Sequence, residues 1–160
     1  MNSKVSVVIA REDGGVSIMK ILRSDSESPV AIAEEVEKWQ ATSGVKAAGF
    51  WPIADSEIPQ DRTFRDAWAS EGKAIAVNMD KARLLQMGRI RTSRDEQLKA
   101  LDVPFMRAIE GGDVARQSEI ASHKQSLRDI PAVFHLSVAS NAEDLNALWP
   151  EGLPRSRVHS

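Results

Sequence analysis

Alternating apolar and polar residues at the start of the chain predict a β-hairpin. Val5, Val7 and Ile9 share one side of an extended segment that is rich in β-branched residues. Gly14-Gly15 then offers the backbone freedom that a tight turn needs, and a second alternating segment follows. We therefore expect an antiparallel hairpin over about residues 4–22.

A helical spacing of apolar residues comes next. Ile32, Val36 and Trp39 lie at i, i+4 and i+7, so they share one face of a helix that begins near Pro29 and ends before Gly44. An apolar run follows the helix and predicts a strand with its proline at a sheet edge or strand end. Residues 1–55 are thus expected to form a small β-β-α-β unit.

Residues 56–79 have the composition of a connector. The segment 61–68 predicts a short capped helix or turn, in which Phe64 and Trp68 form an i, i+4 pair that docks on the first unit. Residues 74–77 predict a short strand or an extended arm.

Residues 80–150 have helical periodicity and predict a C-terminal helical module. Asp80 is expected to cap its first helix, Gly111-Gly112 to bend the chain into a hairpin, and Pro131 to end the last long helix. The predicted helices cover residues 80–100, 103–110 and 114–129, with a short helix before Pro150. The predicted fold class is α+β: a small N-terminal β-β-α-β unit followed by a helical hairpin, a short C-terminal helix and a loosely ordered tail at 151–160.

Composition excludes several functional classes. The 160 residues contain no cysteine, which removes disulfide frameworks, thiol catalysis and cysteine-based metal sites. The formal net charge of −2 does not fit a strongly basic nucleic-acid coat protein. Charge is uneven, however: residues 1–61 hold 10 acidic and 6 basic side chains, whereas residues 62–107 hold 6 acidic and 10 basic ones. No apolar run approaches the ~20 residues of a membrane-spanning helix.

The candidates for catalysis are few. The histidines are His123, His135 and His159, and no Gly-x-Ser-x-Gly motif or phosphate-binding Gly-x-x-x-x-Gly-Lys motif is present. His135 follows a phenylalanine in an apolar stretch, where a packed or half-exposed histidine is the expected state. We predict no catalytic residue, no cofactor and no metal site, and hence a protein that is not an enzyme.

A surface for partners is the remaining candidate. Arg89, Arg91 and Arg94 can form a basic patch on the first long helix, or a solvated face that pairs with acidic neighbours. No aromatic residue lies between these arginines, so a single-strand stacking platform is not expected. Trp68 and Trp149 lie near predicted ends or loops and can either anchor an interface or seal the edge of a small core. These five residues are the predicted partner-binding set.

Three segments of the second half follow one another in a fixed order: Leu101-Asp102-x-x-Phe105-Met106-Arg107-Ala108-x-Glu110-x-Gly112-Asp113, Ile120-x-x-x-Lys124-Gln125-x-Leu127-Arg128-Asp129-Ile130-Pro131, and Ala142-Glu143-Asp144-Leu145-x-Ala147-Leu148-Trp149-Pro150. This ordered set resembles the C-terminal module of small tailed-phage and prophage proteins of the tail-assembly chaperone and tail-fibre-assembly kind. The match covers about residues 80–150 and leaves the N-terminal unit outside it.

This resemblance implies a non-enzymatic phage protein that acts by protein–protein contact in tail or tail-fibre assembly. Its partners would be other phage tail, fibre or virion proteins and copies of itself, in the bacterial host cytoplasm during assembly or in the virion. One alternative is a structural virion component at a head–tail junction or fibre attachment point. A third is a nucleic-acid-binding accessory protein that uses the three arginines. Membrane association is not expected.

Overall fold

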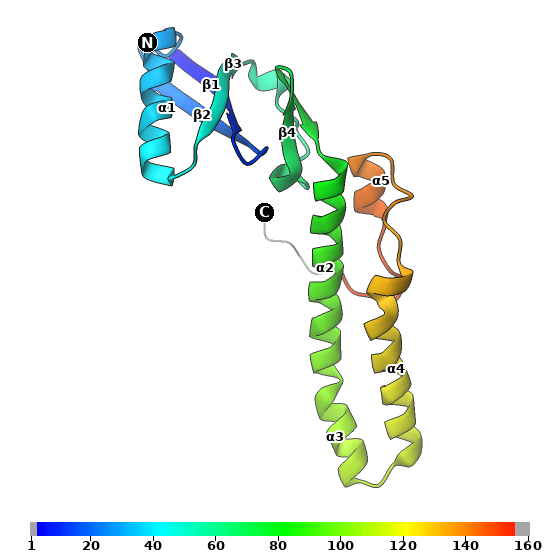
Figure 1. The fold of residues 1–160 in the computed structure, drawn as a ribbon. Helices are drawn as coiled ribbons and strands as arrows, with labels where there is room; N and C mark the ends of the chain where they lie inside the picture. Colours follow the sequence, from blue (N-terminus) through cyan, green and yellow to red (C-terminus); the bar gives the residue numbers. More distant parts are fainter. Residues whose placement is uncertain (1–2, 156–160) are drawn as a thin grey trace. The chain divides into compact units, whose positions relative to one another are not determined.

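The chain forms two units, Met1–Lys81 and Ala82–Ser160, in a computed structural model that describes residues 3–155. The expected α+β fold is confirmed: an N-terminal β-β-α-β sheet precedes a long bent helix, another long helix and a short C-terminal helix (Figure 1). None of the helices in the described residues is long and apolar enough to cross a membrane.

The N-terminal sheet has the strand order β2-β1-β3, with both pairings antiparallel. It consists of β1 (Ser3–Arg11), β2 (Val16–Arg23) and β3 (Ala47–Ile53). The predicted hairpin is confirmed, and its turn depends on Gly14, whose φ of 79° is left-handed, and on Asp13, which accepts a hydrogen bond from the Gly15 amide at 2.8 Å. Because β3 pairs only with β1, Pro52 lies in an edge strand, where its missing N–H is tolerated.

Helix α1 (Pro29–Ser43) covers one face of this sheet (Figure 1). Ile32 and Val36 project from the predicted helix face and are buried with apolar side chains of β1 and β2, while Trp39 packs beside them. Gly44 ends the helix with a φ of 70°, a conformation that costs glycine little.

A second hairpin covers the opposite face of the sheet. Strands β4 (Trp68–Glu71) and β5 (Ala74–Val77) pair around a two-residue turn, and Trp68 is buried with Val8, Val16 and Ile58.

Of the two predictions for residues 61–68, a short capped helix or a turn, the structure has the turn, and Phe64 and Trp68 are both buried. A 3₁₀ turn at Arg65–Ala67 leads directly into β4. The physical reason is Gly72, which adopts a φ of 62° at the first turn position and permits a tight hairpin that places Trp68 opposite Val77.

The C-terminal unit is helical, as predicted. It contains most of α2 (Met79–Ala100), then α3 (Asp102–Glu110), α4 (Val114–Val133) and α5 (Ala142–Ala147). Pro104 has no N–H to donate to Ala100, and the long helix bends at Leu101. The cap of α2 differs from the prediction: Asn78, not Asp80, accepts a hydrogen bond from the Lys81 amide at 3.0 Å.

The turn between α3 and α4 agrees with the sequence, but the end of α4 does not. Gly112 has a φ of 67°, and Asp113 caps α4 by accepting from the Arg116 amide at 2.9 Å. Pro131 lies inside α4 instead of ending it. After the proline, Phe134 N donates to Ile130 O at 2.9 Å, so the helical hydrogen bonding continues. The helix therefore extends about one turn beyond its predicted end.

The chain after α5 is more ordered than the sequence predicted. Leu153 is buried, and Arg155 donates to main-chain oxygens of α5. The remainder of the predicted tail, residues 156–160 with His159, lies outside the described residues.

Candidate protein-binding surface

The three predicted arginines lie on α2 but do not form one patch. Arg94 is half-buried and pairs with Asp95 at 2.7 Å, and Arg89 donates to Gln86 Oε1 at 3.5 Å. Arg91 is exposed, and no hydrogen bond or ion pair joins it to another described residue. At 100° per residue, the first and last of these arginines point about 140° apart. Arg91 is therefore the member of the set that is most available to a partner.

The two predicted tryptophans have different environments. Trp68 is 1% exposed, which favours the interpretation that it seals a core, and its indole N–H has no hydrogen-bond partner among the described residues. Trp149 is half-buried in the segment after α5, and its Nε1 donates to Leu153 O at 2.7 Å. The Arg155 guanidinium lies 5.3 Å from the centroid of the Trp149 ring, within cation–π range.

Side chains of α2 hold the C-terminal segment through its main chain, a feature that sequence reasoning missed. Gln86 and Ser93 are polar yet buried, and both lie on the face of α2 that contains buried Ile90. Gln86 donates a hydrogen bond to Leu148 O (2.9 Å), Ser93 donates to Pro154 O (2.5 Å), and Arg83 donates to Ala139 O (2.9 Å). The only sequence signal was the helical spacing of these polar residues with Ile90, which is easily taken for a solvated face.

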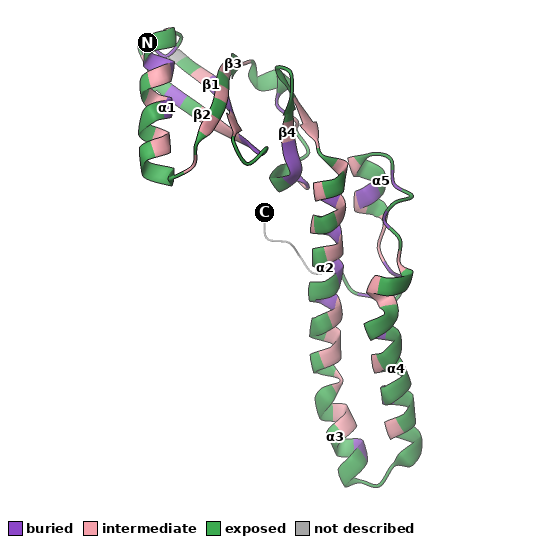
Figure 2. Ribbon diagram, viewed as in Figure 1, coloured by how far each residue is buried: buried purple, intermediate pink, exposed green. Residues whose placement is uncertain are grey.

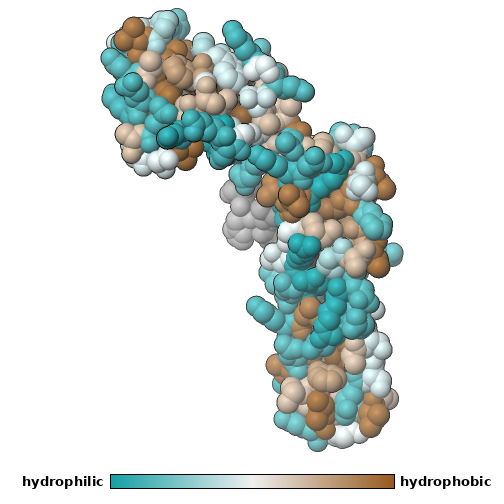
Figure 3. Space-filling view, viewed as in Figure 1, coloured by the Kyte–Doolittle hydropathy of each residue, from teal (hydrophilic) through white to brown (hydrophobic). Residues whose placement is uncertain are grey.

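Exposed apolar side chains lie along α3 and at the first residue of α4. We call Val103, Met106, Ile109 and Val114 the tip surface; they are 57%, 54%, 45% and 70% exposed. Figure 2 shows that this end of the hairpin is largely exposed, and Figure 3 shows apolar side chains on it. A concentration of exposed apolar side chains marks an interaction site more often than a single exposed residue does.

Contacts behind the tip surface hold the two helices in register. Lys124 of α4 pairs with Asp102 of α3 at 2.5 Å, and its ammonium lies 5.5 Å from the centroid of the Phe105 ring. Gln117 of α4 donates to Ala108 O at 3.1 Å. The tip surface is therefore presented by a hairpin whose helices are joined by polar contacts along α3.

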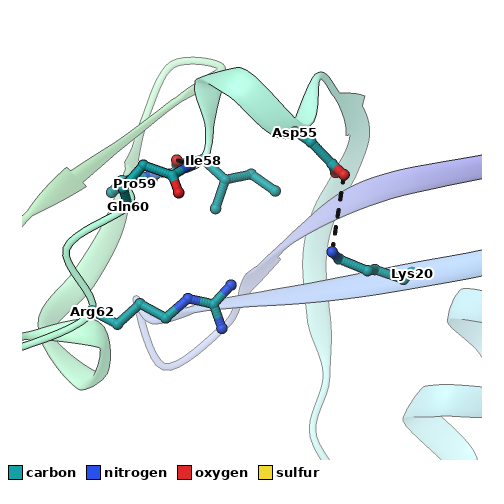
Figure 4. A pocket seen from close by; sticks show the side chains of 6 residues that line it. All are labelled: Lys20, Asp55, Ile58, Pro59, Gln60 and Arg62. Atoms are coloured by element: carbon teal, nitrogen blue, oxygen red, sulfur yellow. Dashed lines mark hydrogen bonds and ion pairs between the residues drawn. The ribbon is translucent and has the colours of Figure 1, made fainter.

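A hollow of about 230 Å³ lies in the N-terminal unit (Figure 4). Its lining residues are Lys20, Asp55, Ile58, Pro59, Gln60 and Arg62. Asp55 accepts a hydrogen bond from Ser6 Oγ, and it pairs with Lys4 at 3.3 Å and with Lys20 at 3.9 Å.

These partners decide what Asp55 can do chemically. The Ser6 hydrogen bond, with the hydrogen bond from Lys4 and the charge of Lys20, lowers the pKa of Asp55. A general acid or base works best with a pKa near the working pH, so this shift makes Asp55 less suited to that role at neutral pH. Lys20 in turn already faces a carboxylate, which reduces its attraction for an anionic ligand.

The histidines in the described residues do not converge with other ionisable groups. His123 and His135 are both exposed, so His135 is less enclosed than the sequence suggested. Within residues 3–155, no group of three or more histidine, aspartate or glutamate side chains is placed to hold a metal ion.

Comparison of the chain with protein-family models, curated proteins and solved structures finds no match. The resemblance of residues 80–150 to phage assembly proteins therefore stays an expectation that depends on the residue pattern.

Proposed function

We propose that this protein acts by non-enzymatic protein–protein contact and that its helical hairpin captures a partner in the assembly of a phage tail or tail fibre. The phage context comes from the resemblance of residues 80–150 alone. The contact function is supported by the tip surface, the observation that carries this proposal.

The exposed area of the tip surface is large enough to matter for binding. The exposed fractions of its four side chains together equal roughly two fully exposed apolar side chains. Burying that much apolar surface contributes about 3–6 kcal/mol before the costs of association are subtracted. A partner therefore gains from covering the tip surface but needs additional polar contacts around it, for which exposed Arg107 and Glu110 are available.

Capture from cells that assemble the particle tests this function. Wild-type protein is expected to retain a defined tail or fibre protein, whereas Met106→Asp should retain at least tenfold less, because it places a carboxylate in the apolar contact. Val138→Asp is a matched control: Val138 is also exposed but lies after α4, away from the tip surface. Equal capture by wild type and Met106→Asp would contradict a role for the tip surface.

Purified particles distinguish a transient assembly factor from a virion component. Quantitative mass spectrometry should find the protein in assembling cells and not in mature particles if it is an assembly factor. Stoichiometric amounts in particles would support the structural alternative instead.

DNA binding has a separate test. A salt titration from low ionic strength reports phosphate contacts by a decrease in affinity with salt. Binding that Arg91→Ala abolishes would favour the nucleic-acid alternative over protein contact.

A further inference from the structure

The hollow in the N-terminal unit is lined by two cationic side chains from different elements. Lys20 comes from β2, whereas Arg62 comes from the segment between β3 and β4 (Figure 4). In this view the Arg62 side chain extends from its loop towards the side of the hollow where Lys20 pairs with Asp55. The Gln60 carboxamide completes the polar part of the lining. The hollow therefore combines two positive charges, one negative charge and an amide.

The Arg62 guanidinium is available to a ligand. No hydrogen bond or ion pair joins it to another described residue. Two other carboxylates of the same segment bind its main chain instead. Glu57 accepts a hydrogen bond from Ala54 N at 3.1 Å, and Asp61 accepts one from Thr63 N at 2.8 Å. An unpaired arginine that lines a hollow offers a planar set of donors to an oxyanion.

Asp55 competes for Lys20 but does not depend on it. Lys20 Nζ lies 3.9 Å from Asp55 Oδ2, near the limit of an ion pair. Lys4 Nζ is closer to the same oxygen, at 3.3 Å, and Ser6 Oγ donates a hydrogen bond to the other one. When Lys20 turns to a ligand, Asp55 therefore keeps a cation and a hydrogen-bond donor.

We propose that this hollow binds a phosphate group, either as the free anion or on a small monoester. A phosphate group carries close to two negative charges at neutral pH, and Arg62 and Lys20 supply two positive charges. Gln60 donates one amide hydrogen to Ile58 O at 3.2 Å and has a second for the ligand. The volume of about 230 Å³ is below the ~300–1,000 Å³ of common ligand pockets, so the hollow suits a small anion.

Solvent exposure sets the strength of this site. The Lys20 side chain is 47% exposed and Arg62 is also exposed, so water and salt screen both charges. We therefore expect a dissociation constant in the millimolar range at low ionic strength, and weaker binding as salt is added.

Titration of the isotope-labelled full chain with inorganic phosphate, up to about 50 mM, measures binding through amide chemical shifts. Saturable shifts are expected around Lys20 and in the segment from Asp55 to Arg62. Acetate, which has a single charge, should bind at least about fivefold more weakly than phosphate. Sodium chloride at matched ionic strength should not reproduce the shifts. If it does, phosphate acts through ionic strength only, and the site is overturned.

Two substitutions with opposite effects test the roles of the lining residues. Arg62→Ala should weaken phosphate binding at least about tenfold, because it removes the unpaired guanidinium. Asp55→Asn should strengthen binding about 3–10-fold, because it removes the carboxylate that competes for Lys20. The same spectra show whether each variant is folded. Full binding by Arg62→Ala would overturn the proposal, and so would weaker binding by a folded Asp55→Asn variant.

Arg65→Ala and Glu57→Gln are the matched controls. Both residues are exposed in the same segment of the chain, but neither lines the hollow. Each substitution should change the affinity by less than about twofold, because solvent screens charges outside the hollow. If Glu57→Gln strengthens binding as much as Asp55→Asn does, net charge explains the effect, and the competition by Asp55 is overturned.

An organic ligand distinguishes free phosphate from a phosphate monoester. Ile58 and Pro59 are the apolar residues of the lining. Phenyl phosphate should bind more tightly than inorganic phosphate if the organic group contacts these side chains, and no more tightly if the site takes the free anion. Because the hollow is separate from the tip surface, a chain that binds no phosphate leaves the proposed function in place.

Discussion

Trp68 shows how strongly a single side chain depends on the turn that positions it. Sequence spacing pairs it with Phe64 on a helix, whereas the structure places it in β4 facing the sheet. Its indole N–H is buried without a partner among the described residues, which costs roughly 1–3 kcal/mol. The favourable free energy of burying the large aromatic ring must therefore exceed the cost of leaving the indole N–H unpaired.

Trp68→Ala is expected to destabilise the N-terminal unit by about 3–5 kcal/mol, because it opens a cavity between the two sheets. Phe50→Ala is a suitable control, since Phe50 is partly exposed on an edge strand and its loss should cost about 1 kcal/mol or less. Urea denaturation followed by tryptophan fluorescence measures both, because Trp39 and Trp51 remain in this unit in either variant. Similar losses for the two variants would contradict the core role of Trp68.

Asp55 gives a prediction about pH. Its pKa is lowered in the folded chain by the Ser6 hydrogen bond and by Lys4 and Lys20, so its ionised form stabilises the fold above the unfolded-state pKa of about 4. That contribution is lost as the pH falls through the lower, folded-state value. Asp55→Asn should therefore be less stable than wild type at pH 7, with a smaller difference near pH 3. Free energies of unfolding at both pH values check this, and a difference that is equal at the two values would contradict it.

At the scale of elements, α2 and the C-terminal segment depend on each other. Gln86 and Ser93 are buried polar side chains whose hydrogen bonds go to main-chain oxygens 61 or more residues away. Without the C-terminal segment, the side-chain donors of Gln86 and Ser93 would lie on the buried face of α2 without these main-chain acceptors. The segment therefore completes the helical unit and is not a loose tail.

Gln86→Ala should destabilise the helical unit by about 1–3 kcal/mol, because it leaves the Leu148 carbonyl without its donor and removes packed volume. Hydrogen–deuterium exchange should increase in residues 145–155 before it increases in α4. The control is Gln125→Ala, whose exposed side chain bonds only to Asp129 of its own helix and should change stability by less than about 0.5 kcal/mol. Unchanged exchange in the C-terminal segment would contradict the coupling.

Elements with strong local signals were predictable, and those that depend on distant contacts were not. The first hairpin, α1, β3 and the long helices follow from periodicity, glycines and caps that lie within each segment. Strand β4 does not, since its strand character comes from pairing with β5 and from the burial of Trp68. The candidate surface divides in the same way: Arg91 was identifiable as an exposed cation, whereas the tip surface was not, because helical spacing alone cannot tell an exposed apolar face from a buried one.

At the scale of the molecule, the chain divides into two compact units, residues 1–81 and 82–160. The N-terminal unit contains Trp39, Trp51 and Trp68, whereas the described helical unit has Trp149 as its only tryptophan. Most helical residues belong to the second unit. Tryptophan fluorescence therefore reports mainly on the first unit and far-ultraviolet circular dichroism mainly on the second.

Denaturation of the full chain should consequently show two transitions that do not coincide between these two probes, as expected when each unit unfolds on its own. Trp68→Ala should shift the fluorescence transition to lower urea and leave the dichroism transition in place, while Gln86→Ala should do the reverse. The alternative is that the two units unfold together, because α2 begins in the first unit and runs into the second. If either substitution moves both transitions equally, the chain unfolds as one cooperative body and the division into two units has no thermodynamic meaning.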